Sequence, residues 1–195
     1  MIVQALALVV TIAGIAVPFQ QDLTDLILAV RFGKKSTRPD AVAEVVAAGS
    51  EKVPLLLSWT RNPPGGVDRR QLYLGMADVF GELRTKQAIP FLIENISLDQ
   101  AFMLNPPWLK SAQAVKARLP CVAALIRIGP EASDALIRAA EEPMERSDWL
   151  AVVFTVAQIG DPGARDFLTS AAAKAKTGVE RARAEEGLKR LDERR

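Results

Sequence analysis

The sequence predicts an all-α protein that folds as an α-solenoid, a stack of similar helical hairpins. Two observations support this prediction. Apolar residues recur at three- and four-residue steps, as in Leu72, Met76 and Val79, which places them on one face of a helix. A helix-ending turn also recurs along the chain, as at Gly160, where a new apolar helical run begins a few residues later.

The composition is that of a globular protein that lacks the common catalytic and electrostatic signatures. Of the 195 residues, 49% are hydrophobic and 25% are charged, which is enough apolar material for a substantial core. Lys and Arg exceed Asp and Glu by only two, too few to indicate a nucleic-acid partner. The chain has no histidine, so it lacks the usual general base and the commonest metal ligand.

The single cysteine, Cys121, cannot form an intrachain disulfide. It lies in the apolar run LPCVAALIRI, which predicts a small buried side chain in place of a reactive thiol.

Residues 1–21 form a separate segment, which we interpret as an export signal or an N-terminal apolar helix. The run from Ile2 to Val17 is almost wholly apolar, and Gly14 and Ala16 are small residues before a cleavage point. No Lys or Arg precedes this run, so a membrane anchor and a packed first helix are the alternatives. An export signal predicts a periplasmic or secreted protein, whereas the alternatives predict a membrane-anchored or cytoplasmic one.

Residues 22–195 are predicted to form the solenoid. Periodicity and helix-breaking residues together indicate helices at 23–32, 39–48, 51–60, 69–83, 87–96, 114–128, 130–142, 149–159, 164–175 and 177–195.

Several residues mark the predicted helix ends. N-caps are expected at Asp22, Ser50, Asp68, and Ser147 or Asp148, because these side chains accept hydrogen bonds from the first turn. Two prolines and two glycines within residues 61–66 predict a loop. Pro120 either kinks the run 114–128 or marks its true start. In the last helix, a thin apolar stripe and a charged face predict a terminal cap, with the stripe formed by Val179, Ala182, Ala184, Leu188 and Leu191.

The turns align in two pairs. Residues 80–92 match residues 156–168 without a gap, and residues 48–56 match residues 128–136 with a turn one residue shorter. The turn anchors are spaced by 35, 45 and 31 residues along the series Gly49, Arg84, Gly129 and Gly160. Glycine accepts the left-handed geometry that closes a helix, small alanines allow close helix approach, and leucines are expected to fill the seam between hairpins.

Four strings within residues 39–175 resemble the HEAT repeat in its bacterial, PBS-lyase-like form: IGDPGARDFL, FGELRTKQAIPFL, IGPEASDALI and AGSEKVPLLL. The sequence departs from that pattern at Arg84, where a turn glycine is usual, and between Ser97 and Gln113. The resemblance implies a right-handed α-solenoid of about four hairpins with capping helices. It also implies a scaffold that binds other proteins, although a minority of such proteins bind nucleic acid or bilin-carrying proteins and a few are enzymes.

Neither catalysis nor a cofactor or metal site is predicted. The acidic pairs Glu141–Glu142 and Glu185–Glu186 lie on charge-rich helical faces and indicate solvated surface. Asp161 lies in a repeat turn, where helix capping accounts for it. Basic residues near the C-terminus alternate with carboxylates, which indicates surface pairing in place of a nucleic-acid site.

The interruption at residues 97–113 is the predicted partner-binding element, through Phe102, Met103, Leu104 and Trp108. Long non-repeat loops in a solenoid often carry function, and exposed aromatic and Met side chains form protein contacts. The alternative is that the loop folds back over a groove between repeats.

The predicted function is therefore that of a non-catalytic scaffold or adaptor whose partner is another protein. The partner is expected on the concave face formed by the second helix of each pair, at residues 52–59, 86–94, 131–138 and 165–174. The alternatives are a lyase-like or chaperone accessory of a cofactor-carrying protein and, less favoured, a nucleic-acid-binding repeat protein. No membrane contact beyond an N-terminal anchor is predicted, and the sequence does not predict the oligomeric state.

Overall fold

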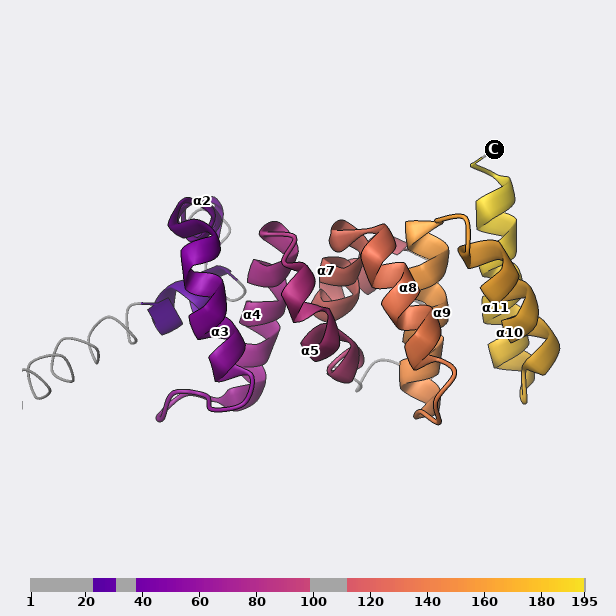
Figure 1. Cartoon of the computed structure of the whole chain (residues 1–195), viewed down its shortest axis with the longest axis horizontal. Helices are drawn as coiled ribbons and strands as arrows, with labels where there is room; N and C mark the ends of the chain where they lie inside the picture. The colour runs from indigo at the N-terminus through magenta and orange to yellow at the C-terminus, as the bar shows by residue number, and fades with distance from the viewer. Residues whose placement is uncertain (1–22, 31–37, 99–111, 195) are drawn as a thin grey trace, which may run out of the picture. The chain divides into compact units, whose positions relative to one another are not determined.

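The computed structural model describes residues 23–30, 38–98 and 112–194 (Figure 1). Within these ranges the chain is all-helical and holds no strand, which confirms the all-α prediction. Residues 1–21, Asp22 and Gly33 lie outside the described residues. Residues 23–30 are helical, and the later helices are α2 (Arg38–Ala48), the 3₁₀ helix η1 (Gly49–Lys52), α3 (Val53–Trp59), α4 (Arg69–Glu82), η2 (Lys86–Ala88), α5 (Ile89–Glu94), α6 (Ala112–Arg118), α7 (Pro120–Ile128), α8 (Pro130–Ala139), α9 (Arg146–Ile159), α10 (Ala164–Lys174) and α11 (Gly178–Asp192).

The chain divides into two compact units, residues 1–79 and 80–195, and the division falls within α4. In the first unit, helix 23–30 packs closely on α4, because a Cβ added at Gly75 would lie 2.7 Å from the Ile27 carbonyl oxygen. The hydroxyl of Tyr73 on α4 donates a 2.5 Å hydrogen bond to the carbonyl of Thr60, directly after α3. Trp59 is 3% exposed, so it is a core residue.

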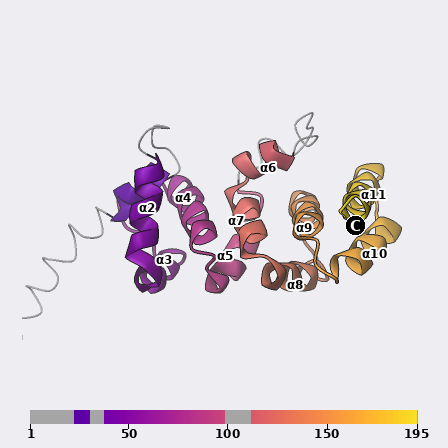
Figure 2. The same ribbon diagram turned by 90° about the horizontal axis from the view of Figure 1, so that it is seen from above.

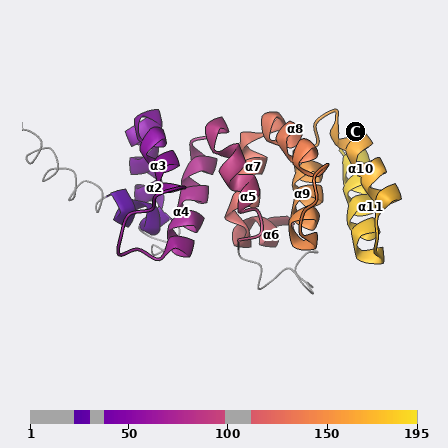
Figure 3. The same ribbon diagram turned by 60° about the horizontal axis from the view of Figure 1, so that its bottom comes forward.

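The second unit contains two rows of helices. Helices α7, α9 and α11 lie in one row, and α5, α8 and α10 lie in the other (Figure 2). Helix α9 contacts α7, α8, α10 and α11, which makes it the centre of the C-terminal half of the unit. Helices α10 and α11 lie side by side (Figure 3), and α6 adjoins α7 through the single residue Leu119.

Equivalent positions of the aligned strings have equivalent environments. The leucines Leu56, Leu92, Leu136 and Leu168 are all 0–1% exposed. The alanines that open the second helices, Ala88, Ala132 and Ala164, are all fully buried. The leucine thus has the same packing role in all four copies. The alanine has it in three, because Lys52, which is only partly buried, stands at this position in the first copy.

The turn residues Arg84 and Gly160 have the same backbone conformation. Their φ angles are 49° and 69°, both in the left-handed region. After Arg84, the N–H of Thr85 bonds the carbonyl of Phe80 at 3.0 Å, and the N–H of Gly160 bonds the carbonyl of Val156 at 2.9 Å. Arg84 thus occupies the glycine position of the repeat in the conformation that glycine adopts most easily.

Replacing Arg84 with glycine is expected to stabilise the chain by about 1 kcal/mol, because a residue with a Cβ is strained in the left-handed region. The reciprocal change Gly160→Ala is expected to destabilise it by at least as much, since the new Cβ would also meet the Arg194 side chain at 2.6 Å. Equilibrium urea unfolding measures both changes. Gly65→Ala, which meets open space, is the control, and a lower stability of Arg84→Gly would contradict the assignment.

Of the predicted caps, Asp68 agrees with the structure, whereas Ser147 or Asp148 does not. The side chain of Ser50, another predicted cap, lies outside the described residues. Asp68 caps α4, because the N–H of Gln71 donates to its Oδ1 at 2.7 Å. Helix α9 instead begins at Arg146, with Glu145 as an N-cap that makes no side-chain bond, so the prediction of Ser147 or Asp148 is wrong. The helix predicted from Glu51 begins with η1, and α3 starts only at Val53, next to Pro54.

Pro120 both ends one helix and begins the next. Helix α6 stops at Arg118 and α7 starts at Pro120, with Leu119 between them in a non-helical conformation. Proline lacks the N–H that a continuous helix needs, and it disfavours helical geometry in the residue before it.

The terminal helix α11 has a different buried stripe from the predicted one. Val179 is 55% exposed and Ala182 is also exposed, so these two assignments are wrong. The buried residues are Arg183, Ala184, Gly187 and Leu191. Gly187 permits a close approach, because a Cβ added there would lie 3.0 Å from the Cβ of Ala157 on α9. At the start of α11, Thr177 and Glu180 form a capping box.

Candidate functional site

The predicted contact residues Phe102, Met103, Leu104 and Trp108 lie outside the described residues. The structure describes both edges of the predicted interruption. Ser97 is 6% exposed, and its hydroxyl donates a hydrogen bond to Oδ1 of Asp148 in the first turn of α9. At the other edge, Ala112 and Gln113 already belong to α6. The chain therefore leaves α5 from a fixed point beside α9.

The residues of the predicted concave partner-binding face belong, in the second unit, mainly to α5, α8 and α10. Each of these helices buries one side through the alanine and leucine described above and exposes the other. The exposed side chains are mostly polar, and they include Pro90, Glu94, Glu131, Asp134, Arg138, Asp166, Thr169 and Lys174. Carboxylates outnumber basic groups among them. We call this set the second-helix surface.

An ion pair joins η2 to one residue of this surface. Lys86 of η2 donates a hydrogen bond to Oε1 of Glu131 on α8, although both side chains are about half exposed or more. The hydrogen bond from Lys86 lowers the pKa of the Glu131 carboxyl below its usual value, because it stabilises the ionised form.

Lys86→Met is expected to raise the pKa of the Glu131 carboxyl toward its ordinary value. The Glu131 carboxyl has a lower pKa in the folded state than in the unfolded chain. It therefore stabilises the fold at pH values above the unfolded pKa, and this stabilisation is lost as the pH falls through the folded pKa. NMR titration of the Glu131 side chain in both proteins measures the change. Lys174→Met, at an exposed lysine of α10, is the control, and an unchanged Glu131 pKa in Lys86→Met would contradict the pairing.

Asp161 has a different role from the predicted helix cap. Helix α10 has Gly163 as its N-cap, with no side-chain capping bond. The Oδ1 atom of Asp161 instead accepts a 3.0 Å hydrogen bond from the hydroxyl of Ser133 on α8. Ser133 is fully buried, so this bond ties the turn before α10 to the preceding hairpin.

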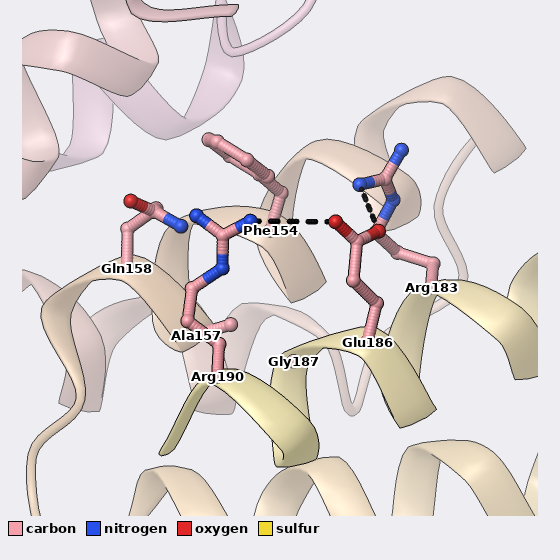
Figure 4. Close-up of a pocket in the computed structure, with 7 residues that line it drawn as sticks. All are labelled: Phe154, Ala157, Gln158, Arg183, Glu186, Gly187 and Arg190. Carbon is pink, nitrogen blue, oxygen red and sulfur yellow. Dashed lines mark hydrogen bonds and ion pairs between the residues drawn. The ribbon is translucent and has the colours of Figure 1, made fainter. Parts of the chain in front are cut away.

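A small pocket lies between α9 and α11 (Figure 4). It opens to solvent, has a cavity volume of about 10 Å³, and is lined by Phe154, Ala157, Gln158, Arg183, Glu186, Gly187 and Arg190. The lining residues come from one run of α9 and one run of α11. Sequence reasoning missed this pocket, because it treated the charges of the last helix as solvated surface.

The charged groups of the pocket form a chain centred on one carboxylate. Arg183 donates to Oε2 of Glu186 at 3.0 Å, and Arg190 donates to Oε1 of the same carboxylate at 3.3 Å. The Arg183 guanidinium also lies 5.8 Å from the centroid of the Phe154 ring, within cation–π range. Arg183 is 9% exposed, and burial lowers its pKa.

The remaining candidate groups have structural roles or are solvated. Cys121 is buried, as predicted. Glu141, Glu142 and Glu185 are exposed. No group of three His, Cys, Asp or Glu residues suited to a metal ion occurs within the described ranges. The same part of the chain contains no helix that is both long and apolar enough to span a membrane.

No family model, curated protein or solved structure matches this chain.

Proposed function

We propose that the chain is a HEAT-like, right-handed α-solenoid that acts as a non-catalytic protein-interaction scaffold. The recurring turns and the equivalent burial of Leu56, Leu92, Leu136 and Leu168 support the repeat assignment. A stack of such hairpins presents its second helices along one continuous surface, which is how repeat proteins bind extended partners.

The observation that carries the functional proposal is the two-sided character of α5, α8 and α10. One side of each helix is buried by packing within the unit, while the second-helix surface is exposed and polar. Interfaces between proteins that also exist separately are about as polar as ordinary protein surface, so this composition suits a partner that binds and dissociates.

The charge of the second-helix surface disfavours the nucleic-acid alternative. Glu94, Glu131, Asp134 and Asp166 are exposed, against Arg138 and Lys174 on the same helices. Lys86 of η2 pairs with Glu131, so the excess of carboxylates is small. A phosphate backbone would be repelled by such a surface, because nucleic-acid binding depends on Lys and Arg contacts. The favoured partner is a protein with basic side chains opposite these carboxylates.

The non-catalytic part of the proposal rests on the sequence, since a chain without histidine lacks the usual acid–base group near neutral pH. Export to the periplasm or the medium is proposed from residues 1–21. Fractionation of the native cell tests it, and recovery in the cytoplasmic fraction would contradict it.

Affinity capture of the full chain from its native cell tests the scaffold proposal. The variant Asp134→Lys/Asp166→Lys reverses two exposed charges on α8 and α10, and it is expected to lose most of the recovered partner protein. The matched control, Glu145→Lys/Glu185→Lys, reverses two exposed charges outside the second-helix surface and should retain the partner. Equal recovery with both variants, or nuclease-sensitive recovery, would contradict the proposal.

A third variant tests the predicted interruption separately. Replacing Phe102, Met103, Leu104 and Trp108 with serine removes the apolar contacts expected there. Reduced recovery would assign these residues to the interface, and full recovery would remove them from it.

A further inference from the structure

The Nε2 atom of Gln158 is buried without a hydrogen-bond partner, and it borders the pocket between α9 and α11. The whole residue is only 8% exposed. A buried amide N–H without an acceptor costs about 1–3 kcal/mol, so native proteins almost always provide a partner for one. This side chain therefore presents to the pocket an N–H that no group of the described residues accepts.

The groups facing Gln158 are donors. Its amide nitrogen is turned toward the guanidinium of Arg190 (Figure 4), and neither group can accept a hydrogen bond from the other. Arg190 uses one nitrogen on Glu186, while a guanidinium carries five N–H donors. An oxygen atom placed between Gln158 and Arg190 would accept from both.

The pocket carries a net positive charge. Arg183 and Arg190 contribute two positive charges, and Glu186, which they share, contributes one negative charge. The backbone N–H groups of Gly187 and Ala157 are not available to a ligand, because both residues lie within regular helices. An additional anion would also stabilise the charged form of Arg183, which burial disfavours.

We propose that this pocket binds a single carboxylate group, held by Gln158 Nε2 and the Arg190 guanidinium. A monoanion matches the single excess positive charge, whereas a phosphate dianion would be repelled by Glu186. The cavity volume of about 10 Å³ is far below that of a cofactor site. It has room for one carboxylate oxygen, and the rest of the group would lie in the open mouth of the pocket. The pocket therefore suits a small group, either a free carboxylate ion or the carboxylate of a peptide.

This site is independent of the proposed scaffold function. It lies between α9 and α11, whereas the second-helix surface is formed by α5, α8 and α10. Loss of carboxylate binding would leave the capture experiment unaffected, and failure of the capture experiment would leave the carboxylate titration unaffected.

Titration of the full chain with sodium acetate, followed through the side-chain amide signals of Gln158 by NMR, tests the proposal. We expect a saturable shift with acetate and none with sodium chloride at equal ionic strength. Arg190→Gln should weaken acetate binding at least tenfold, whereas Lys189→Gln, at a neighbouring exposed residue that does not line the pocket, should leave it unchanged. Identical responses to acetate and chloride would overturn the proposal.

The Gln158→Met variant gives a second, independent readout. Methionine has nearly the same shape as glutamine and no N–H, so the variant should lose the acetate response and show a higher Tm than the wild type without acetate. A lower Tm would mean that the Gln158 amide already has its partner within the chain, which would also overturn the proposal.

Two peptides that differ only at the C-terminus distinguish the source of the carboxylate. If a peptide with a free C-terminal carboxylate binds at least tenfold more tightly than both acetate and its amidated form, the natural ligand is a chain end. If peptide and acetate bind equally, the site takes the free ion.

Discussion

Leu168→Ala is expected to lower the free energy of unfolding by about 2–5 kcal/mol, the usual range for a fully buried leucine. Leu168 is 0% exposed on α10. Its Cδ atoms lie about 3.1 Å from where a Cβ on Gly187 of α11 would be, so it fills the space that Gly187 leaves open. The loss combines the transfer free energy of the removed methyl groups with the cavity that remains.

Leu136→Ala is expected to give a loss of the same size, because Leu136 is equally buried at the equivalent position of α8. Val179→Ala is the control. At 55% exposure it should change stability by no more than about 0.5 kcal/mol. Equilibrium urea unfolding measures all three. A loss below 1 kcal/mol at Leu136 or Leu168 would contradict the proposed seam role of these leucines.

Gly81→Leu and Gly187→Leu are expected to destabilise the second unit by about 1–3 kcal/mol each. A Cβ at Gly81 would lie 2.9 Å from the Cα of Ala124, a backbone atom that cannot turn aside. At Gly187 it would lie 3.0 Å from the Cβ of Ala157 and 3.1 Å from Leu168. Leucine is the better helix former by close to 1 kcal/mol, so a net loss must come from the blocked approach of the helices.

Gly178→Leu is the matched control for these glycines. Gly178 begins α11, and a Cβ added there meets nothing within 4 Å. The same substitution should therefore leave stability unchanged or raise it slightly. If all three variants lost similar stability in urea unfolding, the effect would come from glycine replacement in general and not from helix contact at Gly81 and Gly187.

The sequence was sufficient to predict several local features of the fold. The turn at Gly160, the cap at Asp68 and the buried Cys121 each depend on neighbouring residues, and each is found as predicted. Even Arg84, which departs from the repeat pattern, adopts the left-handed conformation that its alignment with Gly160 implies.

Features that depend on contacts between distant residues could not be predicted in this way. The partner of Asp161 is Ser133, 28 positions away, and the partner of Asp148 is Ser97, 51 positions away. These long-range bonds occupy two of the side chains that were expected to cap helices. Nothing in the local pattern indicates them.

The pocket between α9 and α11 was missed for a related reason. Arg183 looks like one member of a solvated charge cluster, but its stem is buried and its guanidinium faces Phe154 and Glu186. Long basic side chains bury their stems readily. Only the close approach at Gly187, which the sequence does not reveal, brings α11 near enough to enclose Gln158.

Hydrogen exchange of Leu168→Ala, followed by mass spectrometry without denaturant, tests most directly whether the chain is a stack of hairpins. In a stack each hairpin contacts only its neighbours, so exchange should accelerate in α9, α10 and α11 while α5 and α7 retain their wild-type rates. Equal acceleration in all of these helices would show a single undivided core and would contradict the solenoid proposal.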